Sequence, residues 1–519
     1  MTLLVVEAES ELDPAAAKFQ EQLAALKREF GFCDETDIFS PDISEPSKMR
    51  AMKLPLLPGA DPHSIRPYAK RFTPPMKEEM RAQVNKMLKY QVCQRGDGNT
   101  VVSNVHLAPK PEKPPALPGA GAPPASGGGV GQRQPSSQHS GRALLPLLPE
   151  NVTISHSGSG KILTDDRLPN KEILSRRRLT EARAGPEAAG AGSGTSFGPP
   201  GPSGAPPPAK KRWRFCIDYR KVNRIIIQEH YPLPETRECI EYLAGGEIFG
   251  SADLSAMYWQ IELDEASRYL TGFQTEDGVY EMRRVPFGLK SAVAHAQREF
   301  RACLRSDPKL SRVYNYIDDC FWSARGPNKY EDFLEQTRAF FLMCRKFNIK
   351  LSAEKTVLGG SSIRVLGHIV DHEGVRIDPA RSAALTAMPE PTSVKTLEAA
   401  LGAMGYVRSF VDGFSVLAVP LTGMKQWAWA KEHRDAFGAL KEAIARAGTL
   451  SNPDYNAQFF VQADTSKTGT GGTLWQWGKD EHGAKAKKII SYCSKKFNLR
   501  ESRWKTIEQE TFGLIFALQ

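Results

Sequence analysis

A long stretch of low complexity limits what this chain can fold into. Residues 112–210 are rich in Gly, Pro, Ala and Ser, and Phe197 is the only aromatic residue among them. Such a segment cannot bury enough apolar surface to offset the conformational entropy that folding removes. We therefore predict that it is disordered, apart from a short helix around residues 162–184, and that folded sequence lies on both sides of it.

The composition narrows the class of protein. Hydrophobic residues make up 40% of the chain, which is enough for a buried core. The net charge of +10 suits a polyanionic partner such as nucleic acid, although a solvated basic linker explains it equally well. The eight cysteines form no CxxC or Cys/His motif, which excludes a zinc ribbon or knuckle and argues against a disulfide scaffold. Because there is no long apolar run and no secretory signal, we expect no membrane span and a cytoplasmic or nuclear protein.

After the low-complexity stretch, strand-like and helical patterns mix. Apolar residues at three- and four-residue spacing predict a helix at 331–347, and this mixture predicts an α+β domain. A helical subdomain is predicted over about 375–450, where a cap region at 391–393 precedes an amphipathic stripe. The predicted strands are 214–218, 248–254, 313–318 and 320–323, and near the C-terminus 458–464, 471–477 and 488–493, followed by a helix from Trp504.

Acidic residues at the ends of two predicted strands are the candidates for catalysis. Asp318 and Asp319 lie between two apolar runs, at the tip of a predicted hairpin, and Asp253 ends another apolar run. If these strands are neighbours, their carboxylates converge on hard cations such as Mg²⁺. Two such ions would clamp the attacking hydroxyl and the leaving pyrophosphate of a phosphoryl transfer. The alternative for each acid is a solvated turn residue.

Six motifs in a fixed order make the interpretation specific. Together they resemble the reverse transcriptase of Gypsy-like LTR retrotransposons, and the similarity runs from about residue 51 to the C-terminus, interrupted by the low-complexity stretch. The motifs are RFCIDYRKVN at 214–223, YPLP at 231–234, the segment from Asp253-Leu254 to Tyr258-Trp259-Gln260-Ile261, VPFGLK at 285–290, YIDD at 316–319 and LGHIV at 366–370.

The resemblance implies a right-hand polymerase of fingers, palm and thumb, followed by a truncated RNase H-like α/β domain. It also implies that residues 101–110 and Trp213-Arg214 are adjoining strands of the fingers, separated by a long disordered insertion. Lys210, Lys211 and Arg212 are candidates to replace basic residues that this insertion displaces. The implied domains are an N-terminal tail (1–50), the N-terminal part of the fingers (51–111), the insertion (112–210), fingers and palm (211–374), a helical thumb or connection (375–450) and a partial RNase H-like domain (451–519).

The resemblance also assigns roles to individual residues. Asp253 and Asp318 would be the principal ligands of two Mg²⁺ ions, with Mn²⁺ as the alternative metal and Asp319 as a supporting acid. The other implied roles are exclusion of a 2′-hydroxyl by Tyr258, packing of the incoming nucleotide by Phe287 and Gly288, binding of the triphosphate by Arg214, and contact with the primer terminus by Leu366, Gly367 and His368. The structural alternatives to these roles are a core tyrosine at 258, a buried turn at 287–288 and a surface strand arginine at 214.

The C-terminal segment carries two candidate RNase H acids. Asp464 matches the first catalytic acid of that domain. Glu510 shares a helix face with Ile507 and Leu514, so we expect it to face inward, the alternative being a surface acid. The family's nuclease needs further acidic ligands beyond this helix, and the sequence ends at Gln519. We therefore expect little or no RNase H activity.

The sequence thus predicts an RNA-directed DNA polymerase whose partners are an RNA template, a DNA primer and product duplex, and dNTPs, with no membrane. Two alternatives remain. One is a catalytically dead retroelement remnant that only binds nucleic acid, and the other, the weaker, is a nuclease acting alone. The sequence does not specify the oligomeric state, the targeting or the preferred template.

Overall fold

The computed structural model describes residues 14–67, 71–109, 213–480 and 482–519. The predicted disordered insertion lies outside these residues, as do Lys210, Lys211 and Arg212. The described residues form helices and four sheets, which confirms the predicted α+β class. In this part of the chain, no helix combines the length and the apolar character needed to cross a membrane.

The first sheet joins segments from both sides of the insertion. Its strand order is β1-β6-β5-β2-β3, and β2 pairs antiparallel with β3, so that Val105 lies opposite Ile217. This pairing confirms the prediction that the two segments are adjoining strands. Helix α2 (Pro74–Lys89) packs against the sheet through Met80 and Val84. The strands are β1 (Cys93–Arg95), β2 (Val102–Pro109), β3 (Trp213–Asp218), β5 (Gly272–Thr275) and β6 (Gly278–Met282).

A second sheet, with strand order β7-β8-β4-β9, carries the acidic segments. Gly250 leaves room there for the buried indole of Trp322, since a Cβ atom at this position would lie 2.4 Å from the ring. Helix α7 (Lys329–Lys346) packs against β4 and β8, and α6 (Ala292–Leu304) packs against α7. The strands are β4 (Ile248–Asp253), β7 (Tyr314–Tyr316), β8 (Asp319–Ala324) and β9 (Val357–Gly360), and the short helices before and after β4 are α3 (Val222–Ile225), α4 (Thr236–Leu243) and α5 (Met257–Gln260).

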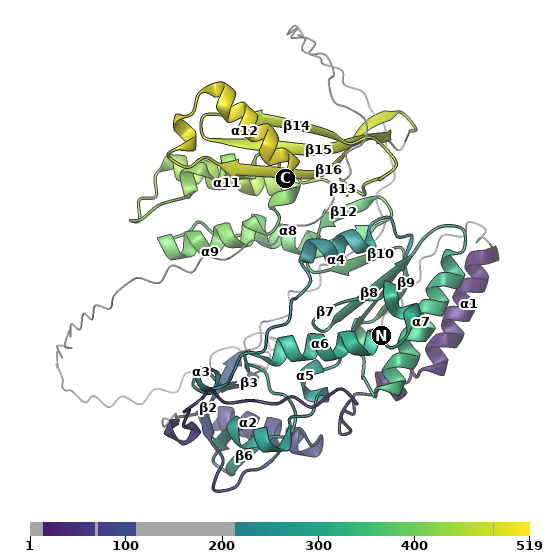
Figure 1. Cartoon of the computed structure of the whole chain (residues 1–519), viewed down its shortest axis with the longest axis vertical. Coiled ribbons are helices and arrows are strands. Elements are labelled where there is room, and N and C mark those ends of the chain that lie inside the picture. Colours follow the sequence, from purple (N-terminus) through teal and green to yellow (C-terminus); the bar gives the residue numbers. More distant parts are fainter. Residues whose placement is uncertain (1–13, 68–70, 110–212, 481) are drawn as a thin grey trace, which may run out of the picture. The chain divides into compact units, whose positions relative to one another are not determined.

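Within the expected N-terminal tail (1–50), the described residues 14–50 pack into the fold instead of forming a tail. Helix α1 (Pro14–Glu29) lies beside α7 (Figure 1) and its residues belong to the same hydrophobic core. Arg338 of α7 donates hydrogen bonds of 2.7 and 2.8 Å to the Glu29 carboxylate. The physical reason is an apolar stripe at helical spacing, which needs a partner surface. Its buried members are Phe19, Leu23, Leu26 and Phe30.

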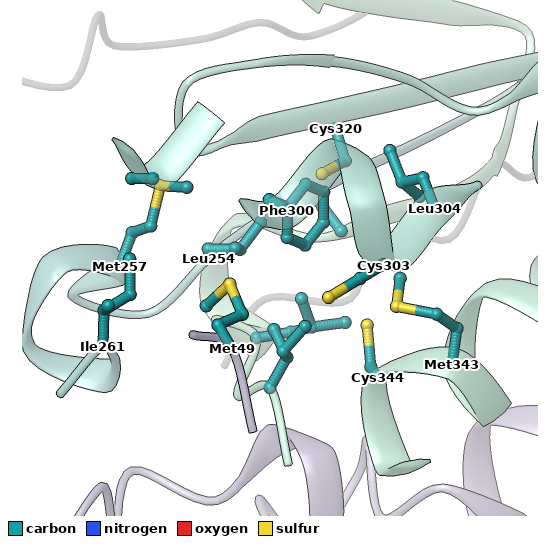
Figure 2. Packing of buried hydrophobic residues seen from close by; sticks show 14 of the residues in the cluster. Met49, Leu254, Met257, Ile261, Phe300, Cys303, Leu304, Cys320, Met343 and Cys344 are labelled. Atoms are coloured by element: carbon teal, nitrogen blue, oxygen red, sulfur yellow. The ribbon is translucent and has the colours of Figure 1, made fainter. Parts of the chain in front are cut away.

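The core between α6, α7 and β8 is rich in sulfur. Figure 2 shows Cys303 of α6 close to Met343 and Cys344 of α7, with Cys320 of β8 nearby. All eight cysteines are free, and burial raises the pKa of Cys303 to about 12. These buried thiols therefore stay protonated and pack as small apolar side chains.

The segment expected to be helical, residues 375–450, contains four α-helices. These helices lie between the third and fourth strands of a third sheet, of order β10-β11-β12-β13. Leu397 and Met404 of the predicted stripe are buried in this segment. Ser393 caps the second of these helices, because its hydroxyl accepts a hydrogen bond from the Thr396 N–H. The elements are β10 (Ser362–Val365), β11 (His368–Asp371), β12 (Gly374–Ile377), β13 (Leu450–Ser451), α8 (Pro379–Thr386), α9 (Val394–Gly405), α10 (Phe414–Leu417) and α11 (Lys431–Ala445).

The last segment follows the predicted order of three strands and a helix. The strands β14 (Phe460–Thr465), β15 (Gly469–Lys479) and β16 (Lys485–Lys496) form an antiparallel sheet in that order. Helix α12 (Thr506–Leu518) lies across this sheet in Figure 1 and contacts β14 and β15. Gly513 permits the close approach, since a Cβ atom there would lie 2.3 Å from the Thr465 hydroxyl oxygen.

Candidate active site

The segment from Tyr316 to Asp319 forms the tip of the β7–β8 hairpin. Tyr316 pairs with Asp319, so Ile317 and Asp318 alone make the connection. Ile317 has a φ of +57°, a left-handed conformation that is costly for a β-branched residue and persists only where the surroundings impose it. The tight turn places Asp318 at the tip and Asp319 at the first position of β8, so two adjacent carboxylates lie at one end of the sheet.

Gln297 of α6 fixes this turn from inside the protein. Its side chain is fully buried, and its Oε1 accepts a hydrogen bond of 2.8 Å from the Ile317 N–H. Its Nε2 donates to the backbone oxygen and to the side-chain oxygen of Asn315, at 3.1 Å each. Sequence analysis did not identify Gln297, although a glutamine on the apolar stripe of a helix is a detectable signal, because buried polar groups need partners.

Asp253 ends β4 directly opposite Asp319. The two residues are register partners, and the Leu254 N–H donates a hydrogen bond of 2.9 Å to the carbonyl oxygen of Asp318. Partners in an antiparallel ladder have Cα atoms about 4.5–5.5 Å apart. The structure therefore brings the three acids from two distant segments to one edge of the second sheet.

Burial and neighbouring carboxylates raise the pKa of two of the acids, Asp253 and Asp319. Burial, followed by the charges of Asp318 and Asp253, raises the pKa of Asp319 to about 6. Burial is also the main reason that the pKa of Asp253 is raised, and the charge of Asp318 adds to it. Because like charges in a partly dehydrated site oppose ionisation, the cluster favours a cation close by.

Lys355 supplies part of that positive charge. Its Nζ lies 2.8 Å from Oδ1 of Asp253. Burial lowers the pKa of Lys355, but the hydrogen bond to Asp253 and the charges of all three acids outweigh it and raise the pKa above its usual value. Lys355 and Arg364 line one small cavity with Asp253 and Asp319. Sequence analysis missed Lys355, which lies outside every predicted element and motif.

The donor set fits hard divalent cations. Mg²⁺ prefers carboxylate oxygens and is often held jointly by one or two carboxylates and a substrate phosphate. In the described ranges, no group of three His, Cys, Asp or Glu side chains is placed so that it could hold a metal ion by itself. A cation at the three acids would therefore need further ligands, such as the oxygens of a substrate phosphate.

Tyr258, Phe287 and Gly288 form a surface beside the acids. Tyr258 of α5 meets Phe287 edge to face with ring centroids 5.1 Å apart, and Phe287 is 55% exposed. Burial raises the pKa of Tyr258, and the charge of Asp318 adds to this shift, which places the phenol near the acids. The Asn223 Nδ2 donates a hydrogen bond of 2.8 Å to the Gly288 carbonyl oxygen. Motifs far apart in the sequence thus build one surface.

Arg214 lies on the first sheet rather than on the sheet of the acids. It is exposed on β3, where it pairs with Ala108 of β2. Strand alternation places it on the same face as Cys216, opposite the face through which Phe215 packs into the core. The structure therefore leaves Arg214 apart from the three acids.

A second tight hairpin joins β10 to β11. Leu366 and Gly367 make the connection, with φ values of +47° and +78°, as in a two-residue hairpin turn. Leu366 lines the same cavity as Asp253, and its carbonyl oxygen accepts a hydrogen bond of 2.6 Å from the Tyr406 hydroxyl. This hairpin tip therefore borders the acids.

His368 points inward from this hairpin. It is 4% exposed and stacks between Tyr406 and Phe410, with ring centroids 5.3 Å away in each case. Burial lowers its pKa to about 4, and its Nδ1 has no hydrogen-bond partner among the described residues. The imidazole is thus part of the core, so the side chain of His368 is not available for the predicted contact with a primer.

Asp464 and Glu510 are both exposed and come from different elements. Asp464 lies on β14, and its neighbour Thr465 faces α12, so strand alternation turns Asp464 toward the other face of the sheet. Glu510 lies on α12. The structure therefore does not gather these two acids as it gathers the three acids of the second sheet.

The prediction that Glu510 faces inward is wrong. Ile507 and Leu514, which share its helix face, are 72% and 48% exposed. The buried residues of α12 are Gln509, whose side chain donates a hydrogen bond of 3.0 Å to the Glu501 carbonyl oxygen, and Gly513, which touches the sheet. Apolar residues cover most of this helix, so hydrophobicity alone could not identify its inner face.

Comparison with known proteins finds family matches for two parts of the chain. A family model for "Reverse transcriptase (RNA-dependent DNA polymerase)" matches residues 202–370, and one for "RNase H-like domain found in reverse transcriptase" matches residues 429–519. The chain is 29% identical over 328 residues to the retrovirus-related Pol polyprotein from transposon opus, and 32% identical over 312 residues to that from transposon 297, both of Drosophila melanogaster. The polyprotein from transposon gypsy of the same fly is 28% identical over 322 residues.

These alignments cover 59–60% of this chain and 28–32% of each relative. The chain thus spans about a third of the length of the curated relatives it matches. Among solved structures, the foamy viral protease-reverse transcriptase in complex with double-stranded DNA has a TM-score of 0.65 at 16% identity, over 98% of this chain and 70% of that chain. The same viral protein with an RNA/DNA hybrid has a TM-score of 0.62 at 16% identity, over 98% of this chain and 54% of that chain. This likeness confirms the expected fold class.

Proposed function

We propose that this chain, which belongs to the reverse transcriptases of gypsy-type retrotransposon Pol polyproteins and carries an RNase H-like domain, acts as an RNA-directed DNA polymerase. One observation carries the proposal: Asp253, Asp318 and Asp319 meet at one edge of the second sheet. The Tyr258–Phe287 surface and the hairpin tip at Leu366 border the same place.

In this proposal the three acids bind two Mg²⁺ or Mn²⁺ ions, with Asp253 and Asp318 as the principal ligands and Asp319 in support. The ions would supply the positive charge that aligns a primer 3′-hydroxyl with a dNTP α-phosphate and stabilises the leaving pyrophosphate. Lys355 holds Asp253 in position and reduces the repulsion within the cluster. Phosphate oxygens of the substrate would be the additional ligands that the ions need.

The neighbouring residues would bind the nucleotide and the primer. The exposed Phe287 ring offers an apolar contact, and Tyr258 fills space that a 2′-hydroxyl would need. The backbone at Leu366 and Gly367 would hold the primer terminus without reading its bases, as a sequence-tolerant enzyme requires. Arg214 would bind the triphosphate bidentately once the first sheet approaches the acids.

The proposed partners are an RNA template, a DNA primer and product duplex, and dNTPs. The foamy viral relatives of this fold were solved with double-stranded DNA and with an RNA/DNA hybrid, and the net charge of +10 favours a polyanion. For the RNase H-like domain we infer little nuclease activity in this polypeptide, because Asp464 and Glu510 are exposed on different elements and a two-metal site needs carboxylates that share the ions.

Primer extension on poly(rA)/oligo(dT) with Mg²⁺ tests the polymerase assignment. The Asp318→Asn variant should lose roughly a hundredfold or more of the extension rate, because metal-ion stabilisation is worth several kcal/mol and each 1.4 kcal/mol is about tenfold. Glu331→Gln is the matched control, since it removes one negative charge from an exposed position of α7. It should extend the primer like the unmodified chain.

Equal extension by the Asp318→Asn variant and the unmodified chain would refute the metal-site assignment. No extension by either protein, together with retained binding of the template-primer, would instead support the alternative of a nucleic-acid-binding remnant. Both variants should have the melting temperature of the unmodified chain, which shows that any loss is not a loss of folding.

A further inference from the structure

One face of the β14–β16 sheet carries stacked aromatic rings with lysines over them. Phe460 stacks on Trp475 with ring centroids 4.4 Å apart, and Trp475 meets Trp477 edge to face at 5.0 Å. Trp477 is 46% exposed. We call Phe460, Trp475, Trp477, Lys485 and Lys487 the aromatic–lysine face.

Both lysines of this face sit over an indole. The Lys485 Nζ lies 4.3 Å from the ring centroid of Trp477, and the Lys487 Nζ lies 4.7 Å from that of Trp475. The Lys487 Nζ also donates a hydrogen bond of 3.2 Å to Oε1 of Gln462. Among the described residues neither lysine forms an ion pair with a carboxylate. Their positive charge is therefore not neutralised by those residues.

The sheet register explains why α12 does not cover these rings. Gly472 of β15 touches α12, since a Cβ atom there would lie 2.7 Å from the Ala517 Cβ. Side chains alternate between the two faces of a strand. Trp475 and Trp477 lie an odd number of residues after Gly472 on the same strand, so their side chains point to the opposite face. Trp477 pairs with Lys487 and thus shares that face with it. The rings are therefore turned away from α12, the helix that covers the other side.

We propose that the aromatic–lysine face binds single-stranded nucleic acid. Exposed aromatic rings stack bases of any identity, and lysines beside them neutralise phosphates, which is the chemistry of sequence-tolerant single-strand binding. A purely apolar patch would suit a protein partner, but a cation over each indole adds charge that a polyanion complements. A duplex keeps its base faces stacked inside, so this face favours a single strand.

This site is separate from the three acids and needs no catalysis. An alternative explanation of the same geometry is that the alkyl chains of the lysines only shield the rings from water. The two readings differ in one respect: shielding predicts no change in nucleic-acid affinity when a ring or a charge is removed, whereas a binding face predicts a loss.

The test is fluorescence anisotropy of labelled oligo(dT) with the full chain, in EDTA and without dNTPs. Trp477→Ala should weaken binding about tenfold, within the range found for single aromatic stacking residues. Lys485→Gln combined with Lys487→Gln should lower the slope of log affinity against log salt by about 1.4, which is the release expected for two phosphate contacts on a single strand. Lys488→Gln is the matched control, because Lys488 pairs with Gln476 and lies on the α12 side of the same strand. It should bind like the unmodified chain.

A second readout locates the contact directly. Oligonucleotides that carry 5-iodouracil should crosslink under ultraviolet light to the peptide containing Trp477. Unchanged oligo(dT) affinity in Trp477→Ala would overturn the proposal, as would an equal loss in Lys488→Gln. Because no extension is measured, a chain without polymerase activity gives the same answer, so failure here and failure of the proposed polymerase are distinguishable. Equal melting temperatures of all variants exclude misfolding as the cause.

Discussion

Two non-glycine residues in left-handed conformation flank the three acids. Ile317 and Leu366 have φ values of +57° and +47° at the tips of their hairpins. Such conformations cost on the order of 1–3 kcal/mol each and persist where neighbouring contacts hold the backbone in them. Here the contacts are the hydrogen bond from the Ile317 N–H to Gln297 and that from the Tyr406 hydroxyl to the Leu366 carbonyl oxygen. The strain is thus held in place by residues other than the three acids.

His368 should make the protein sensitive to acid. Its pKa is about 4 in the folded protein and about 6.5 when unfolded, so between these values the unfolded chain binds more protons. The free energy of unfolding should therefore fall as the pH drops from about 6.5 toward 4, by at most roughly 3 kcal/mol. His368→Phe keeps the stacking on Tyr406 and Phe410 and removes the titration. Urea denaturation at pH 7 and at pH 4.5 should show a smaller acid loss for the variant, and equal losses would contradict this origin.

Sequence analysis identifies acids at the ends of predicted strands more readily than residues whose partners are distant in the sequence. Asp253 and Asp318 end apolar runs, so their place at a sheet edge follows from local pattern. Lys355 and Gln297 leave no such signal, because their roles arise from tertiary contacts. The Lys355–Asp253 pair joins residues 102 apart in the chain. Only the folded chain shows that these side chains meet.

At the scale of elements, helix α6 and the β7–β8 hairpin act as one unit. Gln297 accepts from the Ile317 N–H and donates to Asn315, and both partners lie within the hairpin. A buried N–H that loses its partner costs about 1–3 kcal/mol. The hairpin that carries Asp318 therefore depends on one side chain of the neighbouring helix.

Replacing Gln297 with Leu should both destabilise the protein and slow primer extension. The volume is similar, but the Ile317 N–H loses its partner, so we expect a loss of roughly 1–3 kcal/mol of unfolding free energy. Urea denaturation and steady-state extension measure the two effects. The control is Thr337→Val, which removes the buried hydrogen bond of 3.0 Å from the Trp322 indole to Thr337. Trp322 lies on β8 but away from the hairpin tip that carries Asp318. If both variants slowed extension equally, stability alone would explain the effect and Gln297 would have no positioning role.

The orientation of elements was harder to predict than their existence. The stripe of α9 was predicted correctly, because Leu397 and Met404 lie two turns apart on one helix face and both are buried. The second half of α12 (512–518) is apolar on every side, so shape decides which face of the helix turns inward. Gly513 lets the helix approach the sheet, and Ile507 is left in solvent. Hydrophobic periodicity cannot reveal a steric requirement of this kind.

At the scale of the whole molecule, the folded core is assembled from segments that are distant in the sequence. Helix α1 packs against α7, and β2 pairs with β3 across the insertion. The three C-terminal strands and the helix after them could be predicted in order from the sequence. The docking of α1 could not be predicted, because the apolar stripe of a single helix does not identify its partner surface. The pairing of β2 with β3 was predictable only through the resemblance, since no local pattern links strands so far apart.

That pairing makes the insertion dispensable for the fold. Pro109 lies opposite Trp213 in the antiparallel ladder, so a short turn can connect the two strands. Replacing residues 110–212 with a four-residue Gly/Ser turn should preserve or raise the melting temperature, because each halving of a flexible loop saves about 0.6 kcal/mol of closure entropy. Unfolding of the shortened chain would contradict this and show that the insertion belongs to the core. The rate of primer extension should stay within about twofold of that of the unmodified chain if the three acids suffice. A loss of extension at an unchanged melting temperature would contradict this. If a version that retains Lys210, Lys211 and Arg212 restored extension, those basic residues would be assigned to nucleotide binding.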